Sequence, residues 1–445
     1  MGNDVTIREG FWEDLKADAR THVHLVMIAT KPDIIKQAPL YLELKKRGEF
    51  VLLGHTGQHY DFNLSGGMQE EFGIVPDFNL NIDGPVHQKV AQIIGRLGDL
   101  LVEMKTMGKI VIPYVHGDTM TAMAVSNTAY MNEFASVHVE AGIRTLTPKR
   151  EIFEEILQGL DWEDYFQKLQ VEDNWQRGSI EPYPEQFNTR TTEPATGLFC
   201  APTEQDRDSL IREGFREDRI KVVGNTVYDA TMMVMEDAKS SKIFETYPAL
   251  RDGFIRFCIH RRENCASRER FTAIFDAMEQ LVNEGEHVLL ISLYQTKTAV
   301  EEFGLASRLA EMEKKENFVH SDVWPFYTDV IAAMQKASVC ATDSGSMQEE
   351  MNILGIPCVT LRFGSDRAET VLAGANIIAP PIDGKLIADI IKGAKNHEGM
   401  KAVPNLYGTE VSKRIVDEVL ALLVKESLFS FEQDRLKLSP LPPVR

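Results

Sequence analysis

The chain has 445 residues, and at roughly 100–200 residues per domain this length predicts two or three domains. Its 48 Lys and Arg against 67 Asp and Glu give a net charge of −19, which argues against a general nucleic-acid binder because neutralising phosphates requires clustered basic side chains. No apolar run reaches the roughly 18–20 residues of a membrane span, and residues 1–22 lack the apolar core of a signal peptide.

Short apolar runs alternate with helical patterns through the first half of the chain. We expect strands at residues 24–30, 50–55, 109–115, 135–139, 198–201 and 220–223, with helices such as 34–46 and 120–131 between them. Uniformly apolar strands that alternate with helices are typical of a parallel sheet covered on both faces.

A second series of the same kind follows residue 226. Its expected strands are 254–259, 287–293, 338–341, 358–361 and 375–378, with helices such as 269–283 and 328–336 between them. We therefore predict an α/β protein in which two doubly wound, Rossmann-like domains face one another across a cleft. Residues 22–224 and 408–445 form the N-terminal domain of this prediction, and residues 225–407 form the C-terminal one.

Residues 149–181 interrupt the alternation. They contain nine acidic and four basic residues, and Ile152, Ile156 and Leu160 follow helical spacing. We predict an inserted amphipathic helical hairpin in the first domain. Three roles fit this pattern: a surface element packed on that domain, an oligomer contact or a lid over the cleft.

Polar clusters directly follow several predicted strands, where open α/β sheets bind ligands. HGDT at 116–119 precedes a helix, and its Asp118 is either a helix N-cap or a functional carboxylate. Glu140 ends another strand and is either paired with Arg144 or a proton-transfer group. HRREN at 260–264 is either a basic surface turn or a diphosphate site, because Arg and His suit phosphate oxygens.

The segment TDSGSMQEE at 342–350 has small residues between a strand and a helix, which allow close approach of the backbone to a phosphate. Its Glu350 lies one turn into the helix, where a carboxylate could bind ribose hydroxyls. Arg367 adds positive charge after the next strand.

Several signatures of other protein classes are absent from the sequence. The first strand is followed by KPD instead of GxGxxG, and neither GxxxxGK[ST] nor GxSxG occurs. The five cysteines form no CxxC pair, which favours buried thiols in a reducing cytoplasm over disulfides or a zinc site.

Taken together, the motifs resemble the non-hydrolysing UDP-N-acetylglucosamine 2-epimerase family from about residue 24 to residue 424, apart from the insertion. They follow the family's order: KPDIIKQAPL at 31–40, TGQH at 56–59, HGDT, EAGIRT at 140–145, PEQFN at 184–188, APTE at 201–204, GNTVYDA at 224–230, HRREN and TDSGSMQEE. The resemblance implies the GT-B arrangement, with UDP bound by the C-terminal domain and a helix at about 411–425 returning to the N-terminal one.

The resemblance also implies a reaction. UDP-GlcNAc and UDP-ManNAc interconvert by anti elimination of UDP to 2-acetamidoglucal and re-addition, a path that requires no nicotinamide, flavin or catalytic metal. It implies a homodimer in polysaccharide biosynthesis whose ligand is a UDP-sugar. The net charge, the apolar runs and the cysteines predict a cytoplasmic protein that uses neither nucleic acid nor a membrane.

Carried over position by position, the resemblance assigns proton transfer to Asp118, Glu140 and Glu185. His260 would interact with the departing diphosphate. The substrate-binding residues that it implies are Lys31, Lys36, Arg262, Ser344, Gly345, Ser346, Glu350 and Arg367.

The sequence departs from the family at several of these places. Lys31 stands where the family has Arg, and Ser346 replaces a Gly. In some relatives a second UDP-GlcNAc acts as an activator through QHR and PxHxNP segments, which read Gln58-His59-Tyr60 and 292–296 here, with Tyr294 in place of His. The alternatives are a hydrolysing epimerase that releases ManNAc, an epimerase of a modified UDP-HexNAc, a GT-B glycosyltransferase and a non-catalytic UDP-sugar sensor.

Overall fold

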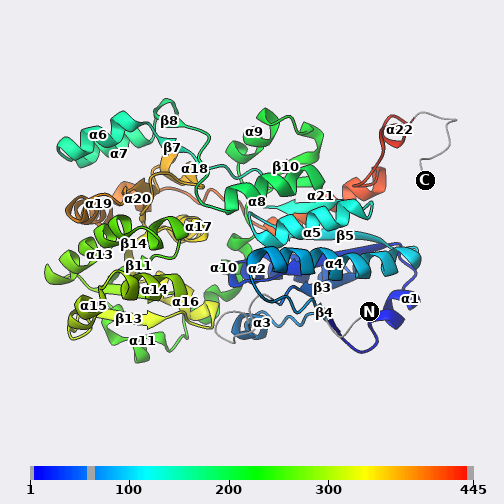
Figure 1. The fold of residues 1–445 in the computed structure, drawn as a ribbon, viewed down its shortest axis with the longest axis horizontal. Coiled ribbons are helices and arrows are strands. Elements are labelled where there is room, and N and C mark those ends of the chain that lie inside the picture. Colours follow the sequence, from blue (N-terminus) through cyan, green and yellow to red (C-terminus); the bar gives the residue numbers. More distant parts are fainter. Residues whose placement is uncertain (1–4, 58–65, 438–445) are drawn as a thin grey trace. The chain divides into compact units, whose positions relative to one another are not determined.

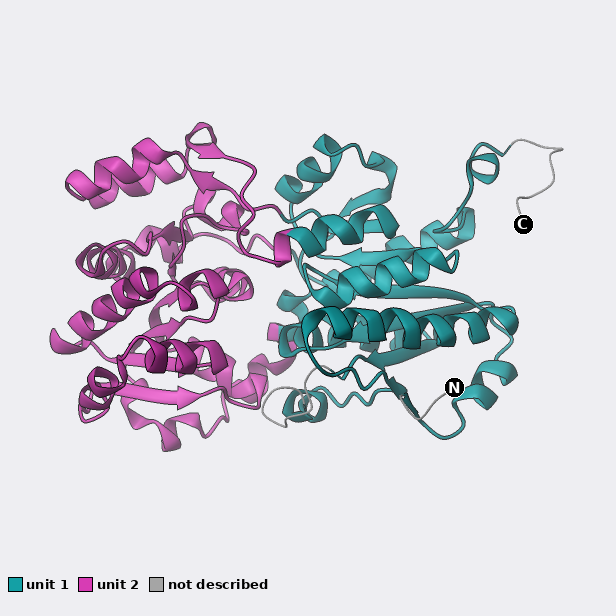
Figure 2. Cartoon of the chain, in the orientation of Figure 1, with its two compact units in different colours: residues 1–143, 187–230, 408–445 teal, residues 144–186, 231–407 magenta. Residues whose placement is uncertain are grey.

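The computed structural model describes residues 5–57 and 66–437. The chain forms two compact units (Figures 1 and 2). Unit 1 comprises Met1–Ile143, Phe187–Ala230 and Gly408–Arg445, and unit 2 comprises Arg144–Gln186 and Thr231–Tyr407.

Unit 1 contains an eight-stranded sheet in the order β1-β4-β3-β2-β5-β6-β9-β10, in which only the β1–β4 pair is antiparallel. The strands are β1 (Thr6–Ile7), β2 (His22–Ile28), β3 (Val51–His55), β4 (Phe78–Asn79), β5 (Ile110–His116), β6 (Ser136–Val139), β9 (Thr196–Ala201) and β10 (Ile220–Val222). The predicted parallel strands of this half are all confirmed.

The helices of unit 1 pack apolar faces onto this sheet. They include α2 (Lys31–Lys46), α4 (Val86–Thr106), α5 (Met120–Met131), α9 (Glu204–Arg212) and α21 (Val411–Lys425). In α4 the buried residues Ile93, Leu97, Leu100, Leu101 and Met104 recur every three or four positions, as a helix with one face in the core requires. The C-terminal helix α21 has the predicted bounds and packs against α2.

Unit 2 contains a six-stranded parallel sheet in the order β13-β12-β11-β14-β15-β16. Its strands are β11 (Phe254–Cys258), β12 (Val288–Ser292), β13 (Phe318–Asp322), β14 (Ala337–Thr342), β15 (Cys358–Thr360) and β16 (Asn376–Ile378). The prediction missed β13, because its polar residues break the apolar run. An edge strand tolerates them, since only one neighbour covers it.

The inserted hairpin belongs to unit 2, so its predicted assignment to the N-terminal domain is wrong. The helices α6 (Arg150–Gln158) and α7 (Trp162–Leu169) form as expected, and β7 (Thr147–Pro148) pairs antiparallel with β8 (Trp175–Gln176). Their apolar residues join the core of unit 2, where the Tyr165 hydroxyl donates to the carbonyl of Ile378 at 2.9 Å. Amphipathic spacing predicted a buried helical face but could not identify the surface that covers it.

A tight contact between α7 and α19 (Gly384–Asn396) tests this packing. An added Cβ at Gly393 would lie 2.1 Å from Nε1 of Trp162. We expect Gly393→Ala to displace α7, lower the unfolding free energy by about 1–3 kcal/mol and increase amide exchange across 150–176.

The matched control is Gly95→Ala, another glycine inside a helix, which has no heavy atom within 4 Å of the added Cβ. It should stabilise the protein by about 1 kcal/mol through helix propensity. Unchanged exchange in the hairpin of the Gly393 variant would contradict the assigned packing.

Candidate functional site

The predicted residues of unit 1 gather at the carboxyl ends of three neighbouring strands, β2, β5 and β6. Lys36 lies in α2, which follows β2, and Asp118 follows β5. Glu140 comes directly after β6. Because these strands are parallel neighbours, residues more than 100 positions apart in sequence lie together at one edge of the sheet.

Glu140 is buried and has a left-handed backbone conformation, with φ of 67°. A non-glycine residue in this region is strained and is often found at functional sites. Its Oε2 accepts hydrogen bonds from Nε2 of His116 at 2.9 Å and from Nδ2 of Asn225 at 2.7 Å, and it pairs with Nζ of Lys36. These three donors orient the carboxylate, and two of them, Lys36 and His116, can balance its charge.

A glycine two residues later makes this turn possible. Gly142 has φ of 89°, and a Cβ there would lie 2.4 Å from the backbone oxygen of Asp206. The backbone N–H of Gly142 donates to Oε1 of Glu193 at 3.3 Å. Only glycine satisfies both the conformation and the close approach.

The surroundings of His116 favour its protonated, positively charged form. Burial lowers the pKa of its imidazole, but the charge of Glu140 and hydrogen bonds to Asp33 and Glu140 outweigh burial and raise the pKa to about 9. Its Nδ1 lies 3.3 Å from Oδ1 of Asp33. Neither His116, Asp33 nor Asn225 was predicted as a site residue, although each lies inside one of the motifs that resemble the family.

Asp118 does not cap α5. The N-cap is Thr119, whose Oγ1 accepts from the backbone N–H of Ala122 at 3.0 Å, so the capping alternative for Asp118 is wrong. The backbone carbonyl of Asp118 accepts a hydrogen bond from the side-chain amide of Asn188, which fixes the position of the loop. Its catalytic assignment stays a prediction.

The two predicted lysines lie at different depths in α2. Lys36 is 1% exposed and forms an ion pair with Glu140. The predicted role in phosphate binding did not include this ion pair. Lys31 is the first residue of the helix and is partly exposed. Phosphate binding by either residue stays a prediction.

In unit 2, the loops after β11 and β14 are tied together by Asp343. This buried carboxylate accepts from the backbone N–H groups of His260 and Arg261 and from Nδ2 of Asn264, at 3.0 to 3.1 Å. Burial lowers the pKa of His260, so its imidazole is neutral at pH 7 and can act as a hydrogen-bond donor or acceptor.

The helix α17 (Gly345–Leu354) begins with the predicted phosphate cradle. Ser344 is its N-cap residue, and Gly345 and Ser346 form its first turn, where backbone N–H groups suit an anion. A Cβ at Gly345 would approach Oδ2 of Asp366 to 3.1 Å, so the loop that follows β15 packs closely beneath the cradle. Glu350 is buried in this helix and accepts from the Tyr327 hydroxyl at 2.8 Å.

Buried arginines support this loop. Arg367 pairs with Glu349, and Nη1 of Arg362 donates to Oδ1 of Asp366 at 2.8 Å. Arg367 is 3% exposed, so its side chain packs inside the protein beneath the loop. Arg261, which was not among the predicted site residues, pairs with Glu185 and approaches Asp366 at 3.8 Å.

Arg262 takes a different direction from Arg261. Its guanidinium lies 5.5 Å from the centroid of the Tyr183 ring, a cation–π contact. The neighbouring backbone N–H of Tyr183 donates to Glu263. These contacts connect the residues just after the inserted segment to the HRREN loop. Substrate binding by Arg262 stays a prediction.

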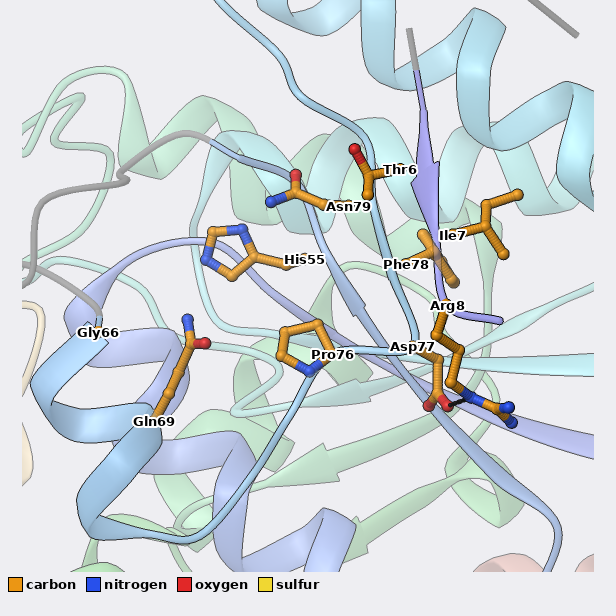
Figure 3. A pocket seen from close by; sticks show the side chains of 10 residues that line it. All are labelled: Thr6, Ile7, Arg8, His55, Gly66, Gln69, Pro76, Asp77, Phe78 and Asn79. Carbon is orange, nitrogen blue, oxygen red and sulfur yellow. Dashed lines mark hydrogen bonds and ion pairs between the residues drawn. The ribbon is translucent and has the colours of Figure 1, made fainter. Parts of the chain in front are cut away.

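A pocket of about 430 Å³ in unit 1 lies apart from these residues (Figure 3). The Arg8–Asp77 ion pair of 2.5 Å lines one end of it, and His55 lies toward the other. None of the predicted site residues lines it.

Of the two segments that correspond to the activator site of some relatives, the structure describes only the second. Gln58-His59-Tyr60 lies outside the described residues, and Tyr294 is the exposed first residue of α14 (Tyr294–Glu302). Among the residues that the structure describes, no group of three or more His, Cys, Asp and Glu is arranged to hold a metal ion.

Known proteins are similar to this chain over most of its length. A family model described as UDP-N-acetylglucosamine 2-epimerase matches residues 42–158 and 178–420. The UDP-N-acetylglucosamine 2-epimerase of Bacillus subtilis is 32% identical over 410 residues, 89% of this chain and 94% of the relative. That of Methanocaldococcus jannaschii is 29% identical over 371 residues, 81% of this chain and 89% of the relative.

The fold is also similar to solved structures. The crystal structure of the Methanocaldococcus jannaschii UDP-GlcNAc 2-epimerase in complex with UDP-GlcNAc and UDP superposes with a TM-score of 0.75 and 26% identity. The alignment covers 90% of this chain and 100% of that one. Residues 159–177, which contain α7, lie between the two stretches that the family model matches, so this part of the hairpin is an addition to the family pattern.

Proposed function

The chain belongs to the UDP-N-acetylglucosamine 2-epimerase family, and on that premise we propose that it interconverts UDP-GlcNAc and UDP-ManNAc. The observation that carries the proposal is Glu140, a buried carboxylate in a strained turn within the EAGIRT motif, held by Lys36, His116 and Asn225. A carboxylate that is ionised and fixed in this way suits the transfer of a proton from carbon.

The chemistry explains why a carboxylate and a phosphate cradle are both needed. The C2 proton of UDP-GlcNAc is not adjacent to a carbonyl, so it is removed together with the leaving group. The C2–H and C1–O bonds break, the C1–C2 double bond of 2-acetamidoglucal forms, and UDP departs with the bonding electrons. UDP then adds back to C1, and a proton adds to the opposite face of C2, which gives UDP-ManNAc. The cycle is redox-neutral.

We assign the proton transfers to Glu140, Asp118 and Glu185. In this proposal, Glu185 is supported by its ion pair with Arg261, which would keep it ionised. Because one carboxylate approaches a given face of a sugar, epimerisation requires a group on each face of C2.

We assign the UDP moiety to unit 2. The first turn of α17 at Ser344, Gly345 and Ser346 would receive the diphosphate, and Glu350 would bind the ribose hydroxyls. His260, neutral at pH 7, would donate a hydrogen bond to the leaving oxygen. This division places the nucleotide in unit 2 and the proton chemistry of Glu140 in unit 1.

The proposed partner is a second copy of the chain, as the family resemblance implies, and the proposed location is the cytoplasm. All five cysteines are free and buried, which suits a reducing compartment. No helix in the described ranges is long and apolar enough to cross a membrane. A native mass near 50.2 kDa in light scattering would contradict the dimer.

Proton NMR of the purified protein with UDP-GlcNAc in D₂O tests the reaction. We expect UDP-ManNAc to appear, with deuterium at C2 of both sugars, because solvent exchanges with the proton on the carboxylates. Accumulation of free ManNAc and UDP would instead identify a hydrolysing enzyme. UDP binding without turnover of UDP-GlcNAc would contradict the proposed substrate.

A further inference from the structure

A continuous chain of buried polar groups leads from the start of α2 to Glu140. Oδ2 of Asp33 accepts from the backbone N–H of Thr30 at 3.1 Å and from its hydroxyl at 3.0 Å, in the capping box of α2. Oδ1 of the same carboxylate faces Nδ1 of His116 at 3.3 Å, and Nε2 of His116 lies 2.9 Å from Glu140. Asp33, His116 and Glu140 are each no more than 5% exposed.

We propose that His116 is the positioning residue for the catalytic carboxylate: held by Asp33, its imidazolium fixes the orientation of Glu140 and keeps Glu140 ionised between turnovers. This inference rests on the proposed function, because it assigns a role within the same reaction. His116 contacts Glu140 and acts through it.

The arrangement of charges supports an imidazolium at this position. The charged groups that contact the His116 ring are Asp33 of α2 and Glu140 after β6, and Lys36 of α2 shares Oε2 of Glu140. Two carboxylates and two cations thus form a buried cluster whose charges sum to zero, and such a cluster avoids the cost of an unpaired buried charge. The neighbouring His138 is directed elsewhere, onto the carbonyl of Gly117 at 2.7 Å.

The geometry distinguishes His116 from the other donors to Glu140. A ring nitrogen on each side lets the imidazole bridge two carboxylates, so the position of its ring is set by α2 through the capping box of Asp33. When Glu140 accepts the C2 proton of the sugar, His116 keeps both of its own protons. The cluster then holds an excess positive charge, which favours return of the proton from Glu140 to carbon.

The experiment compares His116→Gln, Asp33→Asn and the double variant. Glutamine retains a donor toward Glu140 but cannot reach both carboxylates or carry charge. We expect His116→Gln to lower kcat about 10- to 100-fold, less than the roughly 10²- to 10⁴-fold that a proton-transfer group itself contributes. KM and UDP affinity should stay within about twofold. Because Asp33 acts through His116, the double variant should be no slower than His116→Gln alone.

A pH profile separates this role from a structural one. The kcat of the wild type should fall above pH 9 as the imidazolium loses its proton, and this alkaline limb should be absent in His116→Gln. Multiplicative effects of the two substitutions, or an unchanged alkaline limb, would overturn the proposal.

The matched control is His24→Gln, another buried histidine of the same sheet, which is hydrogen-bonded to the Tyr114 hydroxyl at 2.8 Å. It should lower the melting temperature without changing kcat. A loss of kcat in this control as large as in His116→Gln would show that general destabilisation explains both and would overturn the assignment.

A measurement without substrate keeps this inference separate from the proposed function. ¹⁵N NMR of the histidine rings at pH 8 should show both nitrogens of His116 protonated in the wild type and not in Asp33→Asn. If the wild type fails to convert UDP-GlcNAc, the proposed function is wrong, and a neutral His116 ring at pH 8 would by itself overturn the positioning role.

Discussion

Glu140→Gln is expected to remove most of the epimerase activity and leave UDP binding intact. Glutamine has the same shape but cannot accept the C2 proton, so we expect kcat to fall about 10²- to 10⁴-fold. UDP affinity should stay within twofold, because the nucleotide is assigned to the first turn of α17 in unit 2. Deuterium incorporation at C2 and calorimetric titration with UDP measure the two quantities.

Glu133→Gln is the matched control for this substitution. Glu133 is a second glutamate of unit 1 with a left-handed backbone, φ of 63°, but it is half exposed and pairs with Lys105 at 2.5 Å. The same chemical change there should leave kcat unchanged. Full turnover in the Glu140 variant would remove this residue from the mechanism.

Asp366→Asn is expected to have the largest effect on stability. The carboxylate is fully buried, lies 2.8 Å from Arg362 and 3.6 Å from Arg367, and approaches Arg261 at 3.8 Å. Removing its charge takes the carboxylate partner from the buried guanidinium of Arg362, a change that typically costs about 3–5 kcal/mol. Urea denaturation at pH 7 should show this loss of unfolding free energy.

The matched control for that loss is Asp417→Asn. Asp417 is half exposed and pairs with Arg47 at 2.7 Å, so solvent screens the interaction. Its loss should cost at most about 1 kcal/mol. An equal loss of unfolding free energy in the two variants would contradict the view that buried ion pairs of Asp366 stabilise the loop after β15.

The stability that Asp366 contributes depends on pH in a definite direction. Burial favours the neutral acid, but the charges of Arg362, Arg367 and Arg261 outweigh burial and hold the pKa of Asp366 well below its usual range. In the unfolded chain an aspartate titrates at about 3.9. The contribution is therefore complete above that pH and is lost as the pH falls toward the pKa of the folded state. The difference between wild type and Asp366→Asn should narrow below about pH 4.

The two parallel sheets could be predicted from the sequence because their signals are local. A buried strand such as β5 or β14 is a short apolar run, and the helix that follows it has its own spacing, so both can be recognised without knowing their neighbours. The ligand-binding edge follows from the same argument, since motifs such as HGDT and TDSGSMQEE come directly after strands. The polar edge strand β13 gave no such signal.

Which groups meet at that edge was decided only by the tertiary structure. Glu140 is held by Lys36 and Asn225, which are 104 and 85 positions away. The strand order β2-β5-β6-β9-β10 brings the carboxyl ends of these distant strands to one edge of the sheet. The hairpin shows the same limit, since amphipathic spacing predicted its buried face and not the unit that buries it. Hydrophobic periodicity shows which side of a helix or strand is buried. It does not show which other element covers that side, because that contact joins segments that are distant in sequence.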